Sequence, residues 1–86
     1  MDPLPRLRAG IDVLDDGLIA LVAMRRVLVG RVGRFKIDSG LPVRDSLRER
    51  RVHARACSLA NRLGVPATTA RRVMDAVIVD ACAQQE

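Results

Sequence analysis

The sequence predicts an all-α fold with three helices, one long and two shorter. Apolar residues make up 49% of the 86-residue chain, yet Phe35 is its only aromatic residue, so the core must consist of aliphatic side chains. Such a core suits packed helices better than a β-sandwich or barrel, in which aromatic and β-branched residues pack the sheets. Three segments also carry apolar residues at helical spacing, and turns that contain glycine or proline separate them.

The first and longest helix is expected over residues 6–37, between Pro3 and Pro5 on one side and the turn residues DSGLP on the other. Its apolar residues recur alternately every four and three positions, as in a helix that packs along one seam. The seam consists of Leu7, Ile11, Leu14, Leu18, Leu21, Leu28, Val32 and Phe35. At about 1.5 Å rise per residue the helix is about 45 Å long, too long for two short helices of its own chain to cover. A second chain is therefore expected.

The two shorter helices are expected over residues 43–63 and 66–85, within one domain of residues 1–86. Pro42 opens the second helix, and Gly64 ends it as a left-handed cap. Pro66 opens the third helix. Each carries an apolar stripe at helical spacing. The stripes are Val52, Ala56, Leu59 and Leu63 in the second helix, and Val73, Val77, Ile78 and Ala81 in the third.

The sequence argues against a metal-binding, a membrane-spanning or a secreted protein. Cys57, Cys82 and the single histidine, His53, lack the spacing of metal ligands, so no metal site is expected. No apolar run reaches the roughly 18 residues of a membrane span. The first residues also lack the basic and apolar regions of a signal peptide, so the expected location is cytoplasmic.

Polar residues interrupt the apolar stripe on each of the three helices. Arg25 falls on the seam in the middle of the first helix, where a buried cation that binds an anion is the stronger interpretation. Lys36 follows it by about three turns on nearly the same side. The stripes continue into Asp45, Arg48 and Glu49 on the second helix and into Gln85 on the third. A solvated helix end is the alternative at each position, but the coincidence on three helices favours one shared polar pocket.

Four arginines beside these positions lie off the stripes. We expect solvated side chains at Arg26, Arg44, Arg50 and Arg51.

The segments LRAGIDVLDDGLIALVAMRR, VGRFK, PVRDSLRER and DACAQQ resemble the all-helical (AroQ-class) chorismate mutases, over Leu7 to Gln85. The resemblance implies an intertwined helical homodimer, with three helices per protomer and two active sites. It also implies an isomerase that converts chorismate to prephenate for phenylalanine and tyrosine biosynthesis. The reaction is a [3,3] rearrangement that involves no cofactor, metal or covalent intermediate.

The resemblance assigns the arginines to the substrate. Arg8 and Arg25 would bind the two carboxylates of chorismate, and Arg48 would assist. Arg8 lies seventeen residues before Arg25, about 25 Å along the same helix. One straight helix cannot bring both to one small ligand, so Arg8 is expected to serve the partner protomer's site.

The remaining site residues follow from the same resemblance. Lys36 and Gln85 would donate hydrogen bonds to the ether oxygen as its bond breaks. Glu49 would bind the ring hydroxyl, and Asp45 would shape that end of the site. Ala81 stands where members of the family often carry a serine near a substrate carboxylate. That hydrogen bond is then missing, or it is replaced by Asp80, Gln84 or water.

Other functions remain open from the sequence. A mutase that acts on aminodeoxychorismate is one, and an isochorismate-pyruvate lyase is another, although that lyase is expected to lack the acid at Glu49. The pI near 10.9 and the number of arginines suggest a helical nucleic-acid-binding module, but a single aromatic residue forms no platform on which several bases could stack. A purely structural helical dimer is the last alternative.

Overall fold

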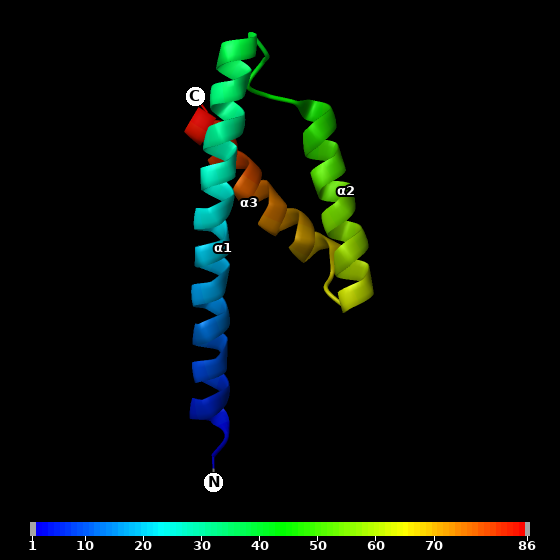
Figure 1. Cartoon of the computed structure of the whole chain (residues 1–86). Coiled ribbons are helices and arrows are strands. Elements are labelled where there is room, and N and C mark those ends of the chain that lie inside the picture. Colours follow the sequence, from blue (N-terminus) through cyan, green and yellow to red (C-terminus); the bar gives the residue numbers. More distant parts are fainter. Residues whose placement is uncertain (1, 86) are drawn as a thin grey trace.

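The computed structural model describes residues 2–85, which form three helices and, within this range, no strand. Helix α1 spans Leu4–Ser39, α2 spans Ser46–Leu63 and α3 spans Ala67–Gln85 (Figure 1). The prediction of an all-α chain with one long and two shorter helices is confirmed for these residues. The two end residues of the expected domain, 1 and 86, lie outside the described range.

Helix α1 is longer than expected, with 36 residues. Pro5 lies in its first turn instead of before it. Proline is tolerated there because the first N–H groups of a helix have no acceptor within the helix. At the other end Gly40 adopts a left-handed conformation, with φ of 70°, and its N–H donates to the carbonyl of Ile37.

Helix α2 begins three residues later than expected, because Asp45 is its N-cap. The backbone of Asp45 is extended, and its Oδ1 accepts a hydrogen bond of 3.0 Å from the backbone N–H of Arg48. The Asp45 side chain thus accepts a hydrogen bond from an N–H group that has no acceptor within the helix. Pro42 has no side-chain acceptor and cannot cap the helix in this way. The predicted left-handed cap at Gly64 is confirmed, with φ of 75°.

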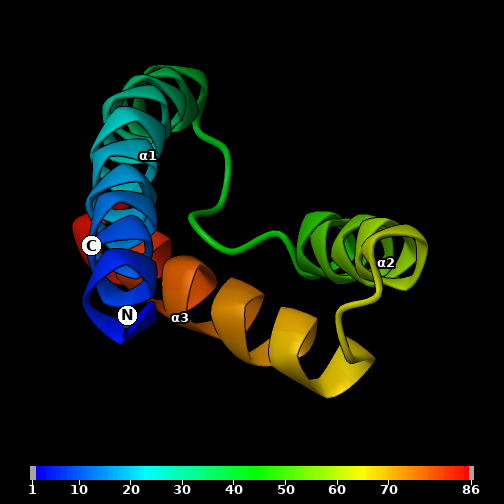
Figure 2. The ribbon, with the colours of Figure 1, turned by 90° about the horizontal axis from the view of Figure 1, so that it is seen from below.

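Helix α3 connects the other two helices. It packs against both α1 and α2, whereas α1 and α2 make no contact with each other. Figure 2 shows this open arrangement from below, with α3 between its two neighbours. The described chain measures 61 × 24 × 16 Å, and among apolar residues only Ala60 and Ile78 are buried. One protomer therefore has almost no core of its own.

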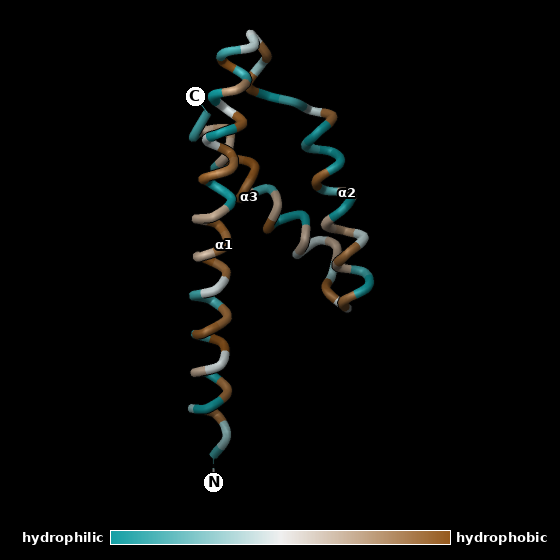
Figure 3. The backbone as a smooth tube through the Cα atoms, in the orientation of Figure 1, coloured by the Kyte–Doolittle hydropathy of each residue, from teal (hydrophilic) through white to brown (hydrophobic). Residues whose placement is uncertain are grey.

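The N-terminal half of α1 stands free. Every described residue up to Leu21 is exposed, and Figure 3 shows apolar residues recurring along this half. The seam residues from Leu7 to Leu21 are between 54% and 70% exposed. A continuous apolar stripe of this length marks an interaction surface. None of the three described helices combines the length and the apolar character that crossing a membrane requires.

We expect Gly64→Ala to lower the free energy of unfolding by about 1–2 kcal/mol, because a Cβ in the left-handed conformation approaches the following carbonyl oxygen. No other atom lies within 4 Å of that Cβ position, so the loss of stability would come from the backbone conformation alone. Gly64→Asn should cost less, since asparagine enters this conformation more readily. Urea unfolding at one protein concentration, followed by circular dichroism, measures both losses. Equal losses of stability in the alanine and asparagine variants would contradict a left-handed cap at Gly64.

Candidate active site

A cavity of about 270 Å³ lies where the C-terminal half of α1, the beginning of α2 and the end of α3 come together. Aliphatic side chains from all three helices form most of its wall. Its polar lining residues are Arg25, Lys36, Arg44, Asp45, Arg48, Glu49 and Gln85. Among residues 2–85, four cations and two carboxylates line the cavity, which gives this part of the lining a formal charge of +2. An apolar wall with a few convergent polar groups is the usual form of a small-molecule site.

The structure brings together seven of the eight residues expected at the site. Six of them belong to the polar lining, and Ala81 lies in the wall. Arg8 is absent from the cavity and lies exposed in the free half of α1. Its position agrees with the geometric argument that one helix cannot bring Arg8 and Arg25 to the same ligand.

Arg25 is half-buried and reaches across to α3. Its Nη1 donates to the backbone carbonyl of Val77 at 3.4 Å. This long contact orients the guanidinium, and because its acceptor is a neutral carbonyl it leaves the positive charge in place. A second, anionic partner can therefore bind the remaining N–H groups.

Arg26 is exposed, as expected for a residue off the seam, and it also has partners on α3. Arg26 forms an ion pair with Asp80 of α3, and its carbonyl accepts a 2.7 Å hydrogen bond from Nε2 of Gln84. These contacts join α1 to α3 outside the cavity. They also engage Asp80 and Gln84, two of the alternatives to the serine hydroxyl, and neither residue lines the cavity.

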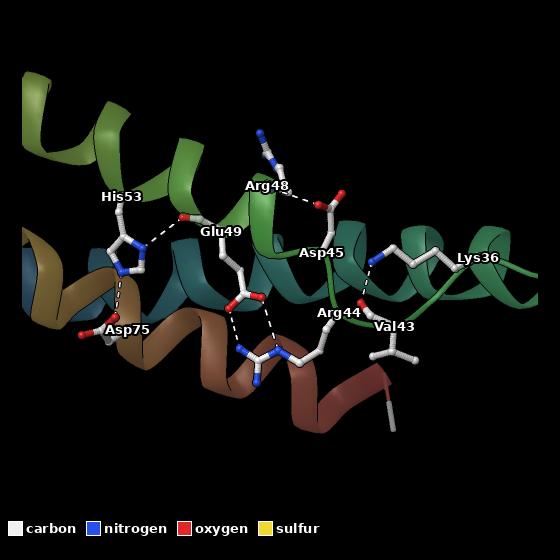
Figure 4. A network of polar contacts seen from close by, with 8 residues as sticks. All are labelled: Lys36, Val43, Arg44, Asp45, Arg48, Glu49, His53 and Asp75. Carbon is white, nitrogen blue, oxygen red and sulfur yellow. Dashed lines mark hydrogen bonds and ion pairs between the residues drawn. The ribbon is translucent and has the colours of Figure 1, made fainter.

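Lys36 lies near the end of α1, over the cavity. Its Nζ donates a 2.8 Å hydrogen bond to the carbonyl of Val43, in the segment that leads to α2 (Figure 4). The ammonium group has three hydrogens, and this bond uses one of them. Lys36 is thus held in place without losing its capacity to donate to a ligand.

The side chain of Gln85 packs directly against Gly33 of α1, where there is no Cβ to displace it. Its Nε2 donates to the carbonyl of Val29 at 3.3 Å. A Cβ at Gly33 would lie 3.2 Å from Cγ of Gln85, closer than most side chains approach one another. At Gly30 the corresponding contact is 3.4 Å, to Nε2 of Gln84, which is ordinary packing. The last turn of α3 can therefore lie directly against α1.

Glu49 is bound by Arg44 through two hydrogen bonds. Nη2 of Arg44 lies 2.6 Å from Oε1, and Nε lies 3.3 Å from Oε2 (Figure 4). The side chain of Glu49 is only 20% exposed, whereas that of Arg44 is 64% exposed. The two residues form a pair at the mouth of the cavity, so the expectation that Arg44 points away from the site was wrong.

The late start of α2 explains this error. Arg44 precedes the N-cap, so its backbone is not helical and its side chain can fold back along the first turn. A helix that began at residue 43 would have placed Arg44 and Glu49 on different faces, because five residues correspond to about 500° of helical rotation. An aspartate at position 45, followed by a helical stripe, is the N-cap signal that could have revealed it.

Asp45 and Arg48 complete this end of the cavity. The Asp45 carboxylate is engaged as the N-cap of α2, and the Arg48 guanidinium extends away from the Arg44–Glu49 pair (Figure 4). Arg48 and Arg25 also line a second hollow of about 490 Å³ along α2 and α3, together with Arg55, Arg62 and Met74 among others. The two hollows thus meet at these two arginines.

His53 ties the first half of α2 to α3. Its Nδ1 lies 3.0 Å from the carbonyl of Glu49, and its Nε2 lies 2.7 Å from Oδ1 of Asp75 (Figure 4). The contact supports the turn that carries Glu49. Elsewhere in residues 2–85, as here, no three histidine, cysteine, aspartate or glutamate side chains gather as metal ligands.

Three known proteins are similar in sequence to this chain. The chain is 38% identical over 85 residues to the bifunctional chorismate mutase/prephenate dehydratase of Escherichia coli (strain K12), which covers 99% of this chain and 22% of that protein. It is 32% identical over 81 residues to the 4-amino-4-deoxychorismate mutase of Streptomyces pristinaespiralis, covering 94% of this chain and 63% of that protein. A 3-dehydroquinate dehydratase of Pyrobaculum aerophilum is 43% identical over 53 residues, 62% of this chain and 18% of that protein.

The chain thus spans less than a quarter of the Escherichia coli and Pyrobaculum relatives and just under two thirds of the Streptomyces relative. The model of the family described as chorismate mutase type II matches residues 7–86. This match includes all three helices and every polar residue of the cavity. The chain therefore belongs to the chorismate mutase type II family.

Proposed function

We propose that the chain converts chorismate to prephenate. The observation that carries the proposal is the cavity, in which Arg25, Lys36, Arg48 and Gln85 converge beside an apolar wall. Chorismate is a dicarboxylate, and the formal charge of +2 on the lining complements its two negative charges. The name of the Escherichia coli relative joins this activity to prephenate dehydratase, which supports prephenate as the product. We further propose that this product enters phenylalanine and tyrosine biosynthesis.

In this proposal the arginines bind the carboxylates. A guanidinium presents parallel N–H groups that match the two oxygens of a carboxylate. Arg25 is already oriented by Val77, and Arg48 lies at the junction of the two hollows. These contacts would hold the folded conformer in which the two reacting carbons meet, which removes much of the entropic barrier.

Lys36 and Gln85 would act on the ether oxygen. A pericyclic rearrangement requires neither a nucleophile nor an acid, but negative charge builds on this oxygen in the transition state. Lys36 donates from α1 and Gln85 from the end of α3, and each is held by one backbone carbonyl. An amide donates without first taking up a proton, so Gln85 suits activity at neutral pH. Glu49 would accept the hydrogen bond of the ring hydroxyl.

We further propose that two protomers form the intertwined homodimer and that Arg8 binds substrate in the partner's site. The exposed seam on the free half of α1 and the nearly absent core of one protomer support this assembly. The same half carries Asp12, Asp15 and Asp16, whereas Arg55 and Arg62 line the second hollow. An α1 helix of a partner would thus meet a surface of opposite charge, next to Arg25 and Arg48.

A second candidate is the same rearrangement of 4-amino-4-deoxychorismate, since the Streptomyces relative bears the name of that mutase. Glu49 is compatible with either substrate, because a carboxylate accepts a hydrogen bond from a hydroxyl or from an ammonium group. An isochorismate-pyruvate lyase is less compatible, because Glu49 supplies the acid that such a lyase is expected to lack.

We expect the purified protein to consume chorismate and form prephenate. Removal of one donor that acts in the transition state typically lowers kcat about 10²–10³-fold, so Lys36→Ala should lose activity to that extent. Arg25→Ala should raise KM as well, since it removes a carboxylate contact. Arg51→Ala is the control, because Arg51 is exposed and lies outside both hollows. The decrease of chorismate absorbance gives the rates, and a wild-type protein without turnover contradicts the proposal.

Mixing two inactive variants tests the exchange of Arg8. In a heterodimer of Arg8→Ala and Lys36→Ala, one site combines an intact Lys36 with an intact Arg8 from the partner. Random reassociation should then restore about a quarter of the wild-type activity per chain, because half of the dimers are mixed and each has one complete site. A mixture of Lys36→Ala and Gln85→Ala, two residues of one cavity, should restore none. No recovery in the first mixture would place Arg8 outside the partner's site.

A methyl group at Gly33 should displace Gln85 and lower kcat about tenfold or more, since donors must be positioned within a few tenths of an ångström. Gly30→Ala is the matched control, because it adds the same methyl group on α1 but meets Gln84 outside the cavity. Replacing glycine by alanine favours the helix by up to about 1 kcal/mol at both positions. The two variants should therefore have similar free energies of unfolding. Equal kcat values for the two would show that Gln85 contributes nothing to the reaction.

A further inference from the structure

We propose that Gln84 is a positioning residue, which fixes the last turn of α3 on α1 so that the neighbouring Gln85 reaches into the cavity. The inference rests on the proposed function, in which Gln85 donates to the ether oxygen. Gln84 itself lies outside the cavity, and it contacts α1 through a hydrogen bond to the carbonyl of Arg26. It acts on the reaction only through Gln85.

Gln85 needs this support because of its place at the end of α3. It is the last residue of that helix, and the final turn of a helix frays readily because its carbonyls have no donor within the helix. The hydrogen bond from Nε2 of Gln85 to the carbonyl of Val29 is long, at 3.3 Å. The direction of Gln85 therefore depends on what holds the turn that carries it.

Gln84 supplies the shorter of the two contacts. Its Nε2 donates to the carbonyl of Arg26 at 2.7 Å, a distance typical of a strong N–H···O bond. Arg26 and Val29 lie three residues apart, on the same side of α1. Two consecutive side chains of α3 thus bind carbonyls about one turn apart on α1. Together the two contacts fix where the last turn of α3 lies along α1 and how it is rotated about its own axis.

Two glycines of α1 leave these carbonyls open. A helical side chain points back toward the N-terminus, so the residue four positions after a carbonyl tends to cover it. Gly30 stands in that position relative to Arg26, and Gly33 relative to Val29. A Cβ at Gly30 would lie 3.4 Å from Nε2 of Gln84, which is an ordinary contact. A methyl group still fits there, but a longer side chain would take the place of the amide.

Arg26 also joins α3 through its side chain. The guanidinium pairs with Asp80, one turn before Gln84, and the two side chains are 48% and 39% exposed. Solvent and salt screen so exposed a pair, which therefore holds the two helices together only weakly. Asp80 offers a matched comparison, because it binds the same residue of α1 but does not adjoin Gln85.

The first test measures kcat and KM for chorismate in the full chain. Gln84→Ala should lower kcat about tenfold and leave KM within about twofold of wild type, because a misplaced Gln85 is missed mainly in the transition state. Gln84→Glu keeps the shape of the side chain but has no N–H to donate, so it should lose as much. Asp80→Asn should stay within about threefold of wild type, since exposed ion pairs contribute little. If Asp80→Asn lowers kcat as far as Gln84→Ala does, general docking of α3 explains the loss and the inference is wrong.

A double-mutant cycle separates positioning from a structural role. In a Gln85→Ala background there is no amide left to position, so adding Gln84→Ala should change kcat by less than about twofold. The same loss in both backgrounds would mean that Gln84 supports the cavity as a whole. That result would overturn the inference.

The side-chain amides give a readout that requires no turnover. The sequence contains two glutamines, Gln84 and Gln85, and one asparagine, Asn61, so the single variants assign every side-chain amide resonance of an isotopically labelled protein. Gln84→Ala should move the Gln85 resonances toward those of a free amide, whereas Asp80→Asn should leave them in place. Unchanged Gln85 resonances in Gln84→Ala contradict the inference. Failure of the proposed function looks different, because wild type would convert no chorismate while the Gln85 resonances still moved.

Discussion

The close approach of α3 to α1 at Gly30 and Gly33 is the contact on which the cavity depends. Helices α1 and α2 do not pack closely against each other, so the residues that they contribute are held at their distance by α3 and by the hydrogen bond from Lys36 to Val43 in the connecting segment. The last turn of α3 lies against α1 because Gly33 lacks a Cβ where Gln85 packs, and His53 with Asp75 ties α3 to α2 farther along the chain. A change in the packing of α3 would therefore shift Lys36 of α1 relative to Glu49 of α2, although neither residue belongs to α3.

The charged groups of the cavity are held in two different ways. Arg25 and Lys36 are oriented by backbone carbonyls, which fix their direction without neutralising them. Glu49, in contrast, is held by a full opposite charge on Arg44. One end of the cavity thus keeps its positive potential for an anion, while the other end is electrically balanced. Preorganised dipoles and charges of this kind need no rearrangement when the reaction occurs, which is where much of their catalytic value lies.

Helical periodicity was sufficient to predict the three helices and the polar residues that interrupt their stripes, because both depend on spacing within one helix. The same reasoning did not reveal the partners of Arg26 and Arg44. The partner of Arg26 is Asp80 on another helix, and no local pattern reveals a contact between residues so far apart in sequence. Arg44 was misplaced because the cap at Asp45, and not Pro42, decides where α2 begins. A helix boundary that moves by three residues changes which side chains share a face.

Lys36 is the only lysine of the sequence, and it lies half-buried in the cavity with its Nζ on the carbonyl of Val43. Every other basic side chain that could compete for an amine-directed reagent is an arginine or the single histidine. Acylating reagents consequently find one side-chain amine, at the centre of the site. A reporter attached through lysine chemistry, such as an isotopically labelled methyl, would therefore lie in the cavity and on no other lysine.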